Sequence, residues 1–305
     1  MADKSADTMT IGGHTVNLSN RDKVFFPESG TTKGDLVDYY RRIAGIALPH
    51  WRDRPLSMQR FPDGLKGGGF FQKDVPDYFP DWVDRVELDK EGGTVTYVLA
   101  NNVATIVYLA DQGVITPHLS LARRDRPDNP DRLIFDLDPS DDDFGKVQEA
   151  ASIVRAALDE LEMASFVQTT GSRGLHVVVP LDRSVAFDDA RHFAKTLADL
   201  AADRNGALLT VAQRKNKRGD RVFLDYLRNA YGQTAVAPYA VRAIEGAPVA
   251  TPLSWDEVGA HDLGPQKYTI GNIFRRLGQR KDPWADIGRH ACSLKSAALK
   301  RLVDC

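Results

Sequence analysis

LIFDLDPS, residues 133–140, places two aspartates one residue apart at the end of an apolar run. Alternate side chains of a β-strand point to the same face, so Asp136 and Asp138 would share one face while the apolar residues fill the other. Two adjacent carboxylates repel each other, and burying them costs free energy unless a cation or hydrogen-bond donors compensate. The pattern therefore predicts either a cation site on this strand or a strand end in solvent, where Asp138 and Ser140 open a turn or cap the next helix.

The composition is that of an ordinary globular protein: 305 residues, 42% hydrophobic and 27% charged. The net charge of −2 excludes a wholly basic nucleic-acid-binding surface, so a polyanionic partner has to be met by local patches. We expect no membrane association, because the N-terminus lacks a stretch of signal-peptide length and no run of eighteen apolar residues occurs. The two cysteines, Cys292 and Cys305, lack metal-site spacing and favour a reducing compartment, so we expect a cytoplasmic location.

Hydrophobic periodicity predicts an alternation of helices and strands. Helices are expected at 31–47, 144–161 and 187–204, where apolar residues recur every three or four positions. Strands are expected at 165–170, 175–181 and 221–227, and short β-type runs at FFQK (70–73), GGTVTYVLA (92–100) and ATIVYLA (104–110). This order predicts an α+β or α/β sheet covered by helices, in which neighbouring strands bring Asp225 beside Asp136 and Asp138.

A glycine-containing motif, QTTGSRGLHVVV (168–179), lies between the two acidic strands. Its glycines allow backbone N–H groups to turn toward an anion, and Ser172, Arg173 and His176 add further donors. The motif predicts a phosphate-binding loop. The alternative is a tight hairpin loop followed by a core histidine.

Basic residues flank Asp225 in sequence, in the run QRKNKRGDR (213–221) and at Arg242. A solvated surface is the alternative for the basic run. Carboxylate oxygens favour Mg²⁺ or Mn²⁺, and three of them beside a triphosphate site describe metal-assisted phosphoryl or nucleotidyl transfer.

The order of these motifs resembles the archaeo-eukaryotic primase superfamily, with its acidic DxD (136–138), its hydroxyl-G-x-x-G-x-H motif (170–176) and its late aspartate (225). More closely, the chain resembles the polymerase module of ligase D, the non-homologous end-joining ligase of bacteria and archaea. The further matches are NRDKVFFPESGTTKGDLVDYY (20–40), RFPDG (60–64), GFFQK (69–73), His118 and APYAVR (237–242).

The resemblance implies an α+β primase-polymerase fold: a mixed or antiparallel central sheet flanked by helices, with the active site in a cleft between two sub-lobes. It implies one catalytic domain over residues 1–305, with the family motifs at about 16–245 and a C-terminal helical part at 246–305. The implied activity is addition of ribo- or deoxynucleotides, from NTP or dNTP, to a DNA 3′-hydroxyl at gaps and double-strand break ends. Two Mn²⁺ or Mg²⁺ ions would assist it, and the location would be the cytoplasm, at the nucleoid.

The resemblance also assigns site residues. The metal ligands would be Asp136, Asp138 and Asp225, and His118 would complete the catalytic set. Nucleotide binding would involve Thr170, Ser172, Arg173, His176, Gln233, Arg242, Arg60 and Lys73. DNA would contact Asn20, Lys23 and Lys33 through a downstream 5′-phosphate, Phe70 and Phe71 through template stacking, and Arg218 in a loop that aligns two ends.

Two positions depart from the family pattern. Thr170 stands where the family often has serine, which keeps the hydroxyl. Gln233 stands where some relatives have lysine, so that part of the nucleotide grip is weaker or shared with Arg242. Phe70 and Phe71 can alternatively be core residues, and the lysines at 23 and 33 ordinary surface residues.

The implied partners are DNA with gaps or 3′ overhangs and a downstream 5′-phosphate, the end-binding protein Ku, and a DNA ligase. The 305 residues contain no K-x-D-G motif of nucleotidyl-lysine ligases, so ligation would come from a separate protein or from another part of a longer polypeptide.

Two rival functions fit parts of the sequence. FDLDPS also resembles the opening motif of haloacid-dehalogenase-like phosphatases, with Asp136 as the nucleophile, although that motif normally begins its domain. The chain can also be interpreted as a non-catalytic DNA-end-binding module that uses Lys23, Lys33 and the 213–221 run on phosphates.

Overall fold

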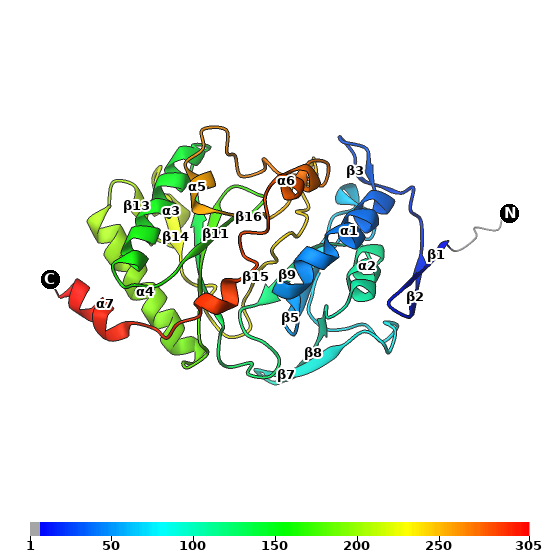
Figure 1. Ribbon diagram of the computed structural model, residues 1–305, viewed down its shortest axis with the longest axis horizontal. Coiled ribbons are helices and arrows are strands. Elements are labelled where there is room, and N and C mark those ends of the chain that lie inside the picture. Colours follow the sequence, from blue (N-terminus) through cyan, green and yellow to red (C-terminus); the bar gives the residue numbers. More distant parts are fainter. Residues whose placement is uncertain (1–6, 305) are drawn as a thin grey trace. The chain divides into compact units, whose positions relative to one another are not determined.

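The computed structural model describes residues 7–304, which divide into two compact units (Figure 1). The first unit comprises residues 7–120, 236–249 and 268–275, and the second 121–235, 250–267 and 276–304. The chain passes between the units several times, so neither is continuous in sequence. The single catalytic domain expected over 1–305 stays a prediction, and Cys305 lies outside the described residues.

The first unit contains an antiparallel sheet in which β9, β5, β8 and β7 follow one another and β6 pairs with β5. These strands are β5 (Pro55–Arg60), β6 (Phe70–Gln72), β7 (Arg85–Lys90), β8 (Gly93–Leu99) and β9 (Val114–Ser120). The other elements of the unit are two hairpins, a short helical turn and two helices: β1 (Asp7–Ile11), β2 (His14–Leu18), β3 (Val24–Phe26), β4 (Thr31–Thr32), η1 (Leu65–Gly67), α1 (Lys33–Trp51) and α2 (Val103–Asp111).

Helix α1 confirms the helix predicted from the 31–47 pattern. Thr32 caps it through a capping box with Asp35, in which each side chain bonds the other residue's backbone N–H. Its apolar stripe is buried, including Tyr39 and Tyr40, whose hydroxyls donate to the carbonyls of Tyr239 and Ile115. The stripe thus reaches the core without leaving a tyrosine hydroxyl unpaired.

Helix α2 corrects the prediction of a β-type run at 104–110. The side chain of Asn102 accepts the N–H of Thr105 at 2.8 Å and starts the helix, and residues 104–111 are all buried. A helix buried on every side has no polar face, so its sequence is a continuous apolar run. Periodicity cannot distinguish such a run from a buried strand.

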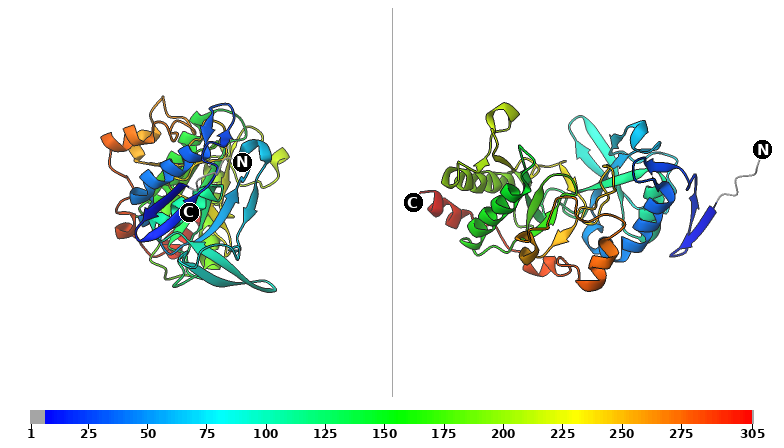
Figure 2. Two further views of the ribbon diagram at one scale, coloured as in Figure 1. Left: turned by 90° about the vertical axis from the view of Figure 1, so that its right-hand side faces the viewer. Right: turned by 90° about the horizontal axis from the view of Figure 1, so that it is seen from above.

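The second unit is built on a six-stranded sheet in the order β13-β14-β10-β12-β11-β16. All neighbours are antiparallel except β13 and β14, which are parallel, so the expected mixed sheet of an α+β fold is confirmed. The strands are β10 (Arg132–Asp138), β11 (Phe166–Thr169), β12 (Leu175–Pro180), β13 (Leu209–Thr210), β14 (Val222–Asp225) and β16 (Pro252–Leu253). Helices α3 (Phe144–Asp159) and α4 (Phe187–Arg204) lie side by side against one face of this sheet (Figure 2).

The remaining elements are short. They are η2 (Lys215–Lys217), β15 (Thr234–Val236), α5 (Trp255–Val258), α6 (Ile273–Gln279), η3 (Ile287–His290) and α7 (Ser296–Val303). Between residues 246 and 304, α5, α6, η3, α7 and the two-residue strand β16 are joined by turns and loops that make up most of the segment.

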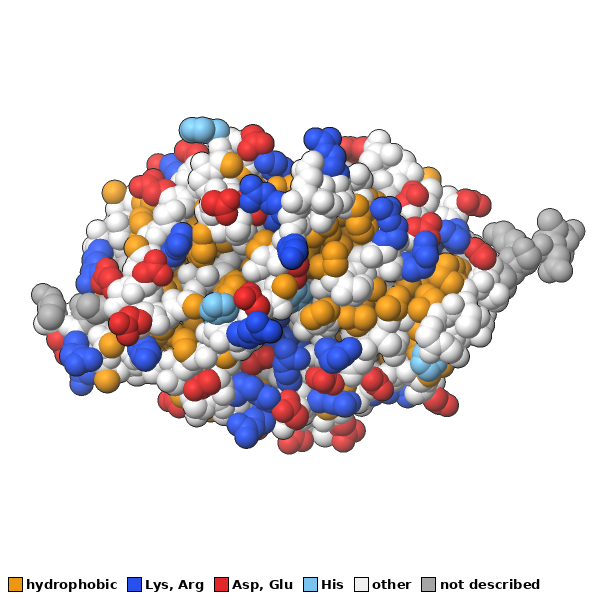
Figure 3. All heavy atoms as spheres, viewed as in Figure 1, with side chains coloured by type: hydrophobic (Ala, Val, Ile, Leu, Met, Phe, Trp, Pro, Cys, Tyr) orange, Lys and Arg blue, Asp and Glu red, His pale blue; other side chains and the backbone are white. Residues whose placement is uncertain are grey.

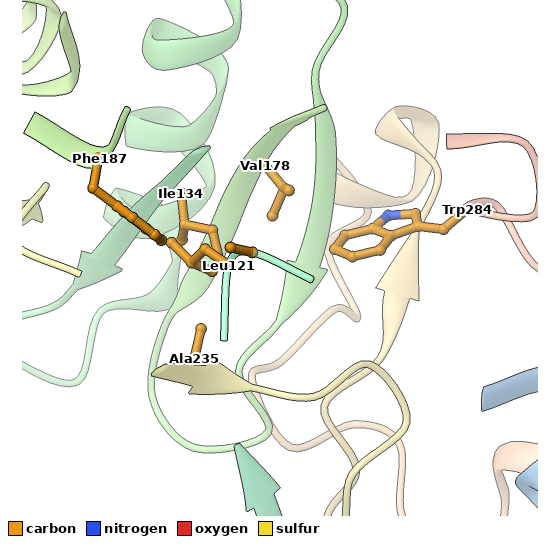
Figure 4. Close-up of a cluster of buried hydrophobic side chains, with 7 residues drawn as sticks. Leu121, Ile134, Val178, Phe187, Ala235 and Trp284 are labelled. Carbon is orange, nitrogen blue, oxygen red and sulfur yellow. The ribbon is translucent and has the colours of Figure 1, made fainter. Parts of the chain in front are cut away.

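A cluster of buried side chains anchors the sheet of the second unit next to its acidic residues (Figure 4). Ile134, on β10, packs with Val178 of β12, Phe187 of α4 and Trp284. The indole N–H of Trp284 donates to the carbonyl of Val167 at 3.2 Å. The cluster therefore fixes β10 two residues before Asp136.

The surface carries both signs of charge, and acidic and basic side chains are interspersed on the face shown in Figure 3. Within residues 7–304 every helix is too short or too polar to span a bilayer.

Candidate functional site

Three carboxylates lie on one face of two adjacent strands in the second unit. Asp136 of β10 is directly opposite Asp225 of β14, and Asp138 follows two residues later on β10. Directly opposite residues of an antiparallel pair have Cβ atoms about 4.5–5.5 Å apart on the same face, which residue i+2 shares. The predicted meeting of Asp225 with Asp136 and Asp138 is confirmed at the level of strand pairing. Their role as metal ligands stays a proposal.

Asp136 is buried between two nitrogen donors. Its Oδ2 accepts a hydrogen bond from Nε of Arg228 at 2.6 Å, and its Oδ1 lies 3.3 Å from Nε2 of His176, the residue opposite on β12. Burial acts to raise the pKa of Asp136, but His176 and Arg228 outweigh it and hold that pKa below its ordinary value. Asp136 is therefore an ionised carboxylate in a buried position.

The other two carboxylates are shifted in the opposite direction. Burial, and then the charge of Asp136, raise the pKa of Asp138 to about 6. Burial is also the main reason that the pKa of Asp225 is raised, although its Oδ1 accepts the N–H of Leu227 at 2.7 Å. Raised pKa values of two acids beside an ionised third indicate a site with too little positive charge, which a cation or a proton would stabilise.

The donor types, three carboxylates, suit a divalent cation. As they are placed, no group of three or more His, Cys, Asp or Glu side chains among residues 7–304 could hold one metal ion. Arg228 engages Oδ2 of Asp136, whereas the buried Oδ1 faces the His176 ring at 3.3 Å without a well-aligned hydrogen bond from a described residue. Hard carboxylate oxygens of this kind are the ligands of Mg²⁺ and Mn²⁺.

Sequence reasoning missed two residues of this site, Arg228 and Asn229. Pairing between β10 and β14 ends at Asp136. Two residues earlier on β10, the side-chain amide of Asn229 takes the place of a paired strand and bonds the backbone of Ile134. Its Oδ1 accepts the N–H of Ile134 at 2.8 Å, and its Nδ2 donates to the carbonyl of Ile134 at 2.7 Å. Asn229 thereby ties the turn after β14 to β10 and sets Arg228 beside Asp136. The only signal in the sequence was a polar pair shortly after the late aspartate.

The predicted phosphate-binding loop is the turn of the β11–β12 hairpin, so the hairpin alternative is correct about its form. Oγ1 of Thr170 donates to the carbonyl of Gly174 at 3.1 Å and accepts the N–H groups of Ser172 and Gly174. A Cβ atom on Gly174 would lie 2.0 Å from the carbonyl oxygen of Leu137. Only glycine permits this approach, which places the loop directly against the acidic end of β10.

The two donors beside this loop are placed differently. His176 is buried, and its Nδ1 lies 3.3 Å from Nε2 of Gln168, which is opposite it on β11. Arg173 is exposed and donates to the carbonyl of Asp141 at 2.9 Å. The site face of the sheet thus carries a continuous row of Asp225, Asp136, His176 and Gln168 across four strands.

Arg218 and Gln233 lie in loops of the second unit. The Arg218 guanidinium lies 3.7 Å above the ring of Phe223 and donates to the carbonyls of Ala212 and Gln213, both at 2.9 Å. Arg218 therefore holds the basic 213–221 loop in shape. Gln233 is exposed.

In the first unit, Phe70 and Phe71 are 50% and 60% exposed, so the alternative that they are core residues is wrong. The Phe71 ring contacts the ring of His118 edge-on, with centroids 5.3 Å apart. Arg60 is buried and donates from Nη1 to the hydroxyl of Tyr78, a residue that is 61% exposed and that sequence reasoning missed. Phe70, Phe71 and Tyr78 form a solvent-facing aromatic surface.

Lys73 and Arg242 lie in the same unit. Lys73 follows the end of β6 and is exposed. Arg242 is half-buried, and its backbone N–H donates to the carbonyl of Pro248 at 2.7 Å.

The three residues predicted to bind a 5′-phosphate lie near one another in the first unit. Asn20 is exposed, Lys23 is paired with Asp63 and donates to the carbonyl of Pro62, and Lys33 is only 5% exposed. The surface-residue alternative is therefore wrong for Lys33. An open pocket of about 990 Å³ is lined by residues that include Asn20 and Lys23.

Comparison with known proteins supports one family. Residues 32–284 match the family described as LigD, primase-polymerase domain. The chain is 34% identical over 279 residues to the multifunctional non-homologous end joining protein LigD of Mycolicibacterium smegmatis, covering 90% of this chain and 36% of that protein. It is 28% identical over 277 residues to the bifunctional non-homologous end joining protein LigD of Bacillus subtilis, covering 90% and 44%. The chain thus spans less than half the length of these relatives.

A solved structure agrees. The polymerase domain of Mycobacterium tuberculosis ligase D, in complex with DNA, superimposes with a TM-score of 0.85 at 30% identity, covering 90% of this chain and 99% of that one. This match confirms the predicted fold. Because the family match covers the acidic strands, the hairpin loop and the aromatic surface, this chain belongs to the LigD primase-polymerase domain family.

Proposed function

We propose that this chain adds nucleotides to the 3′-hydroxyl of DNA at gaps and double-strand break ends during non-homologous end joining. The observation that carries the proposal is the placement of Asp136, Asp138 and Asp225 on one face of two paired strands in a member of this family. In the reaction the 3′-oxygen attacks the α-phosphorus of a nucleoside triphosphate, and pyrophosphate leaves.

Asp136, Asp138 and Asp225 would hold two Mn²⁺ or Mg²⁺ ions. When bound, such ions favour the deprotonated 3′-hydroxyl and neutralise charge on the leaving pyrophosphate. The raised pKa of Asp138 supports this assignment, because a cation beside it would relieve the same electrostatic cost that a proton relieves.

The side chains proposed to bind the nucleotide are polar or basic. In the second unit we assign this role to Ser172, Arg173 and His176, with Thr170 holding the loop in shape and Gln233 adding an exposed amide. In the first unit we assign it to Arg60, Lys73 and Arg242, with His118 near the reacting end. Family resemblance favours ribonucleotides.

DNA would be bound by the aromatic surface and by cations. Phe70 and Phe71 are exposed enough to stack on template bases, an interaction worth about 1–3 kcal/mol per base. Asn20 and Lys23 would contact a downstream 5′-phosphate, and Lys33, whose buried ammonium binds Ser19 and Asp111, would support their turn. The basic loop that Arg218 shapes would help align two ends. Ku and a DNA ligase would be partners, and the place of action would be the cytoplasm, at the nucleoid.

Extension of a gapped, 5′-phosphorylated duplex tests the proposal, with ribo- and deoxynucleotides and with Mn²⁺ and Mg²⁺ compared. The double variant Asp136→Ala/Asp138→Ala should lose extension while still binding the duplex. Glu149→Gln, at an exposed position of α3, serves as the control and should extend normally. If no combination of nucleotide and metal extends the primer, the proposal fails.

The same preparation separates the rival functions. Hydrolysis of a generic phosphomonoester without primer extension would favour the phosphatase. Unchanged function of the double variant would favour the non-catalytic binding module.

A further inference from the structure

A buried aspartate from a distant part of the chain holds the residue that precedes Asn20. Asp111 ends α2, is 6% exposed, and lies 92 residues from Ser19 in sequence. Its Oδ1 accepts the backbone N–H of Ser19 at 2.8 Å, and its Oδ2 lies 3.4 Å from Oγ of Ser19. A hydrogen bond from an N–H to a buried carboxylate is charge-assisted and short, so it fixes Ser19 firmly.

Lys33 holds the other backbone group of Ser19. Its Nζ donates to the carbonyl of Ser19 at 2.7 Å and to Oγ of Ser19 at 2.9 Å, and it lies 2.7 Å from Oδ1 of Asp111. An ammonium group has three N–H donors, and these three acceptors match them. Asp111 and Lys33 therefore form a buried ion pair that binds both the N–H and the carbonyl of one residue.

The turn that follows Ser19 is held at both ends. Asn20 has φ +49°, a left-handed conformation that asparagine adopts more readily than most residues other than glycine. The N-terminus of α1 supports the other end of the turn: the N–H of Lys33 donates to the carbonyl of Lys23, and the N–H of Gly34 to that of Arg21, both at 2.8 Å. The turn is thus held between Asp111 on one side and a helix N-terminus on the other.

The described residues that line the pocket include four acids, Asp7, Asp22, Asp35 and Asp38, and two cations, Arg21 and Lys23, of which Lys23 is better placed for an anion. Arg21 bonds the carboxylates of Asp7 and Asp38, each at 2.8 Å. Asp35 is used in the capping box of α1. Lys23 is paired with Asp63, which is not among the pocket residues named above. The Asp63 side chain is 72% exposed, so an anionic ligand can easily displace it from Lys23.

We propose that Asp111 is a positioning residue for recognition of the downstream 5′-phosphate. It does not contact DNA, because a buried anion would repel a phosphate. It acts by fixing Ser19 and the ammonium of Lys33, and through them the orientation of Asn20 at the pocket. The inference rests on the proposed role of Asn20 and Lys23 in binding this phosphate, with Lys33 as part of their support.

The test compares the affinity for two gapped duplexes that differ only in a 5′-phosphate or a 5′-hydroxyl at the downstream end, measured by fluorescence anisotropy. The readout is the ratio of the two dissociation constants for the wild type, Asp111→Asn and Asp111→Glu. The wild type should prefer the phosphate by about tenfold or more, the size of one charge-assisted hydrogen bond. In Asp111→Asn this ratio should fall toward one while affinity for the 5′-hydroxyl duplex is retained.

Glu257→Gln is the matched control. Glu257 and Arg276 form another buried carboxylate pair, with Nη2 2.8 Å from Oε2, and they lie in the second unit. Losing that pair should lower stability without changing the phosphate ratio. Asp111→Glu retains the charge and the fold but displaces the carboxylate by one methylene, so its ratio should be reduced several-fold even if Asp111→Asn does not fold.

The outcomes are separable. A wild type without phosphate preference overturns the proposed role of the phosphate-binding residues, and this inference with it. If the wild type prefers the 5′-phosphate and the folded Asp111 variants keep the same preference, this inference alone is overturned. Hydrogen exchange of the Ser19 amide gives a second readout: exchange should be faster in Asp111→Asn, and unchanged exchange contradicts the mechanism.

Discussion

Replacing Asp138 by asparagine should make the protein more stable at neutral pH while abolishing nucleotide addition. Asp138 is largely buried beside Asp136, and its pKa is raised from 3.8 to about 6. This difference of about 2.2 corresponds to about 3 kcal/mol at 1.36 kcal/mol per pKa unit. The ionised folded state is therefore destabilised by up to about 3 kcal/mol, and the neutral amide removes that cost.

The sign of the pH dependence follows from linkage. Below pH 3.8 the carboxyl is protonated in both folded and unfolded states, so it imposes no cost. The cost grows as the pH rises from 3.8 to about 6 and is complete above 6, because the unfolded state loses this proton first. The stability gain of Asp138→Asn should thus be about 1 kcal/mol at pH 4.5 and about 3 kcal/mol at pH 7.5.

Urea denaturation in EDTA at the two pH values measures this gain, with Asp142→Asn as the control. The Asp142 side chain is fully exposed, so its variant should stay within about 0.5 kcal/mol of the wild type at both pH values. Added Mn²⁺ should then stabilise the wild type and leave Asp138→Asn unchanged, because the variant lacks one of the three carboxylates. The reasoning is refuted if Asp138→Asn is no more stable than the wild type at pH 7.5, or if its gain is the same at both pH values.

Four further substitutions test other parts of the site. Asp225→Asn should abolish primer extension and leave the dissociation constant for gapped DNA within about twofold, and retained extension would remove Asp225 from the metal ligands. Asp63→Asn should raise affinity for the 5′-phosphorylated duplex by up to about fivefold, because the exposed Lys23–Asp63 ion pair, worth about 0–1 kcal/mol, no longer competes with the phosphate. Unchanged or weaker binding contradicts this. Asn229→Ala should lower the free energy of unfolding by roughly 2–4 kcal/mol, since the N–H and carbonyl of Ile134 lose their partner; a loss below about 1 kcal/mol in urea denaturation speaks against it. Phe71→Ala should weaken binding of a template overhang by about 1–3 kcal/mol, and equal binding in a gel-shift titration would exclude stacking.

The local pattern of apolar and polar residues was sufficient to predict the elements that have one buried and one exposed face. The helix predicted at 187–204 matches α4, and the stripe at 31–47 matches the greater part of α1. The acidic strand at 133–138 was recognisable because two carboxylates on one face of an apolar strand need compensation, and this chemistry can be inferred from the residue types alone. The meeting of this strand with the one that carries Asp225 was expected from the alternation of strands and helices, although α3, β11, β12, α4, β13 and η2 lie between them in the chain.

Where burial is uniform, local pattern failed. The run 104–110 is buried on every side, so it showed neither a helical nor a strand period, and it folds as α2 because it packs against α1 and β2. Its capping residue, Asn102, was the one local sign of a helix.

Contacts between residues far apart in the chain were beyond local pattern. Lys33 has the sequence context of a surface lysine, yet it is buried because Asp111 lies 78 residues further on and Ser19 folds back over it. Arg228 meets Asp136 across 92 residues because β14 pairs with β10 and Asn229 holds the following turn. Periodicity and residue type report the environment that a side chain requires, whereas the identity of its partner depends on how the strands and helices pack, and that information is not local.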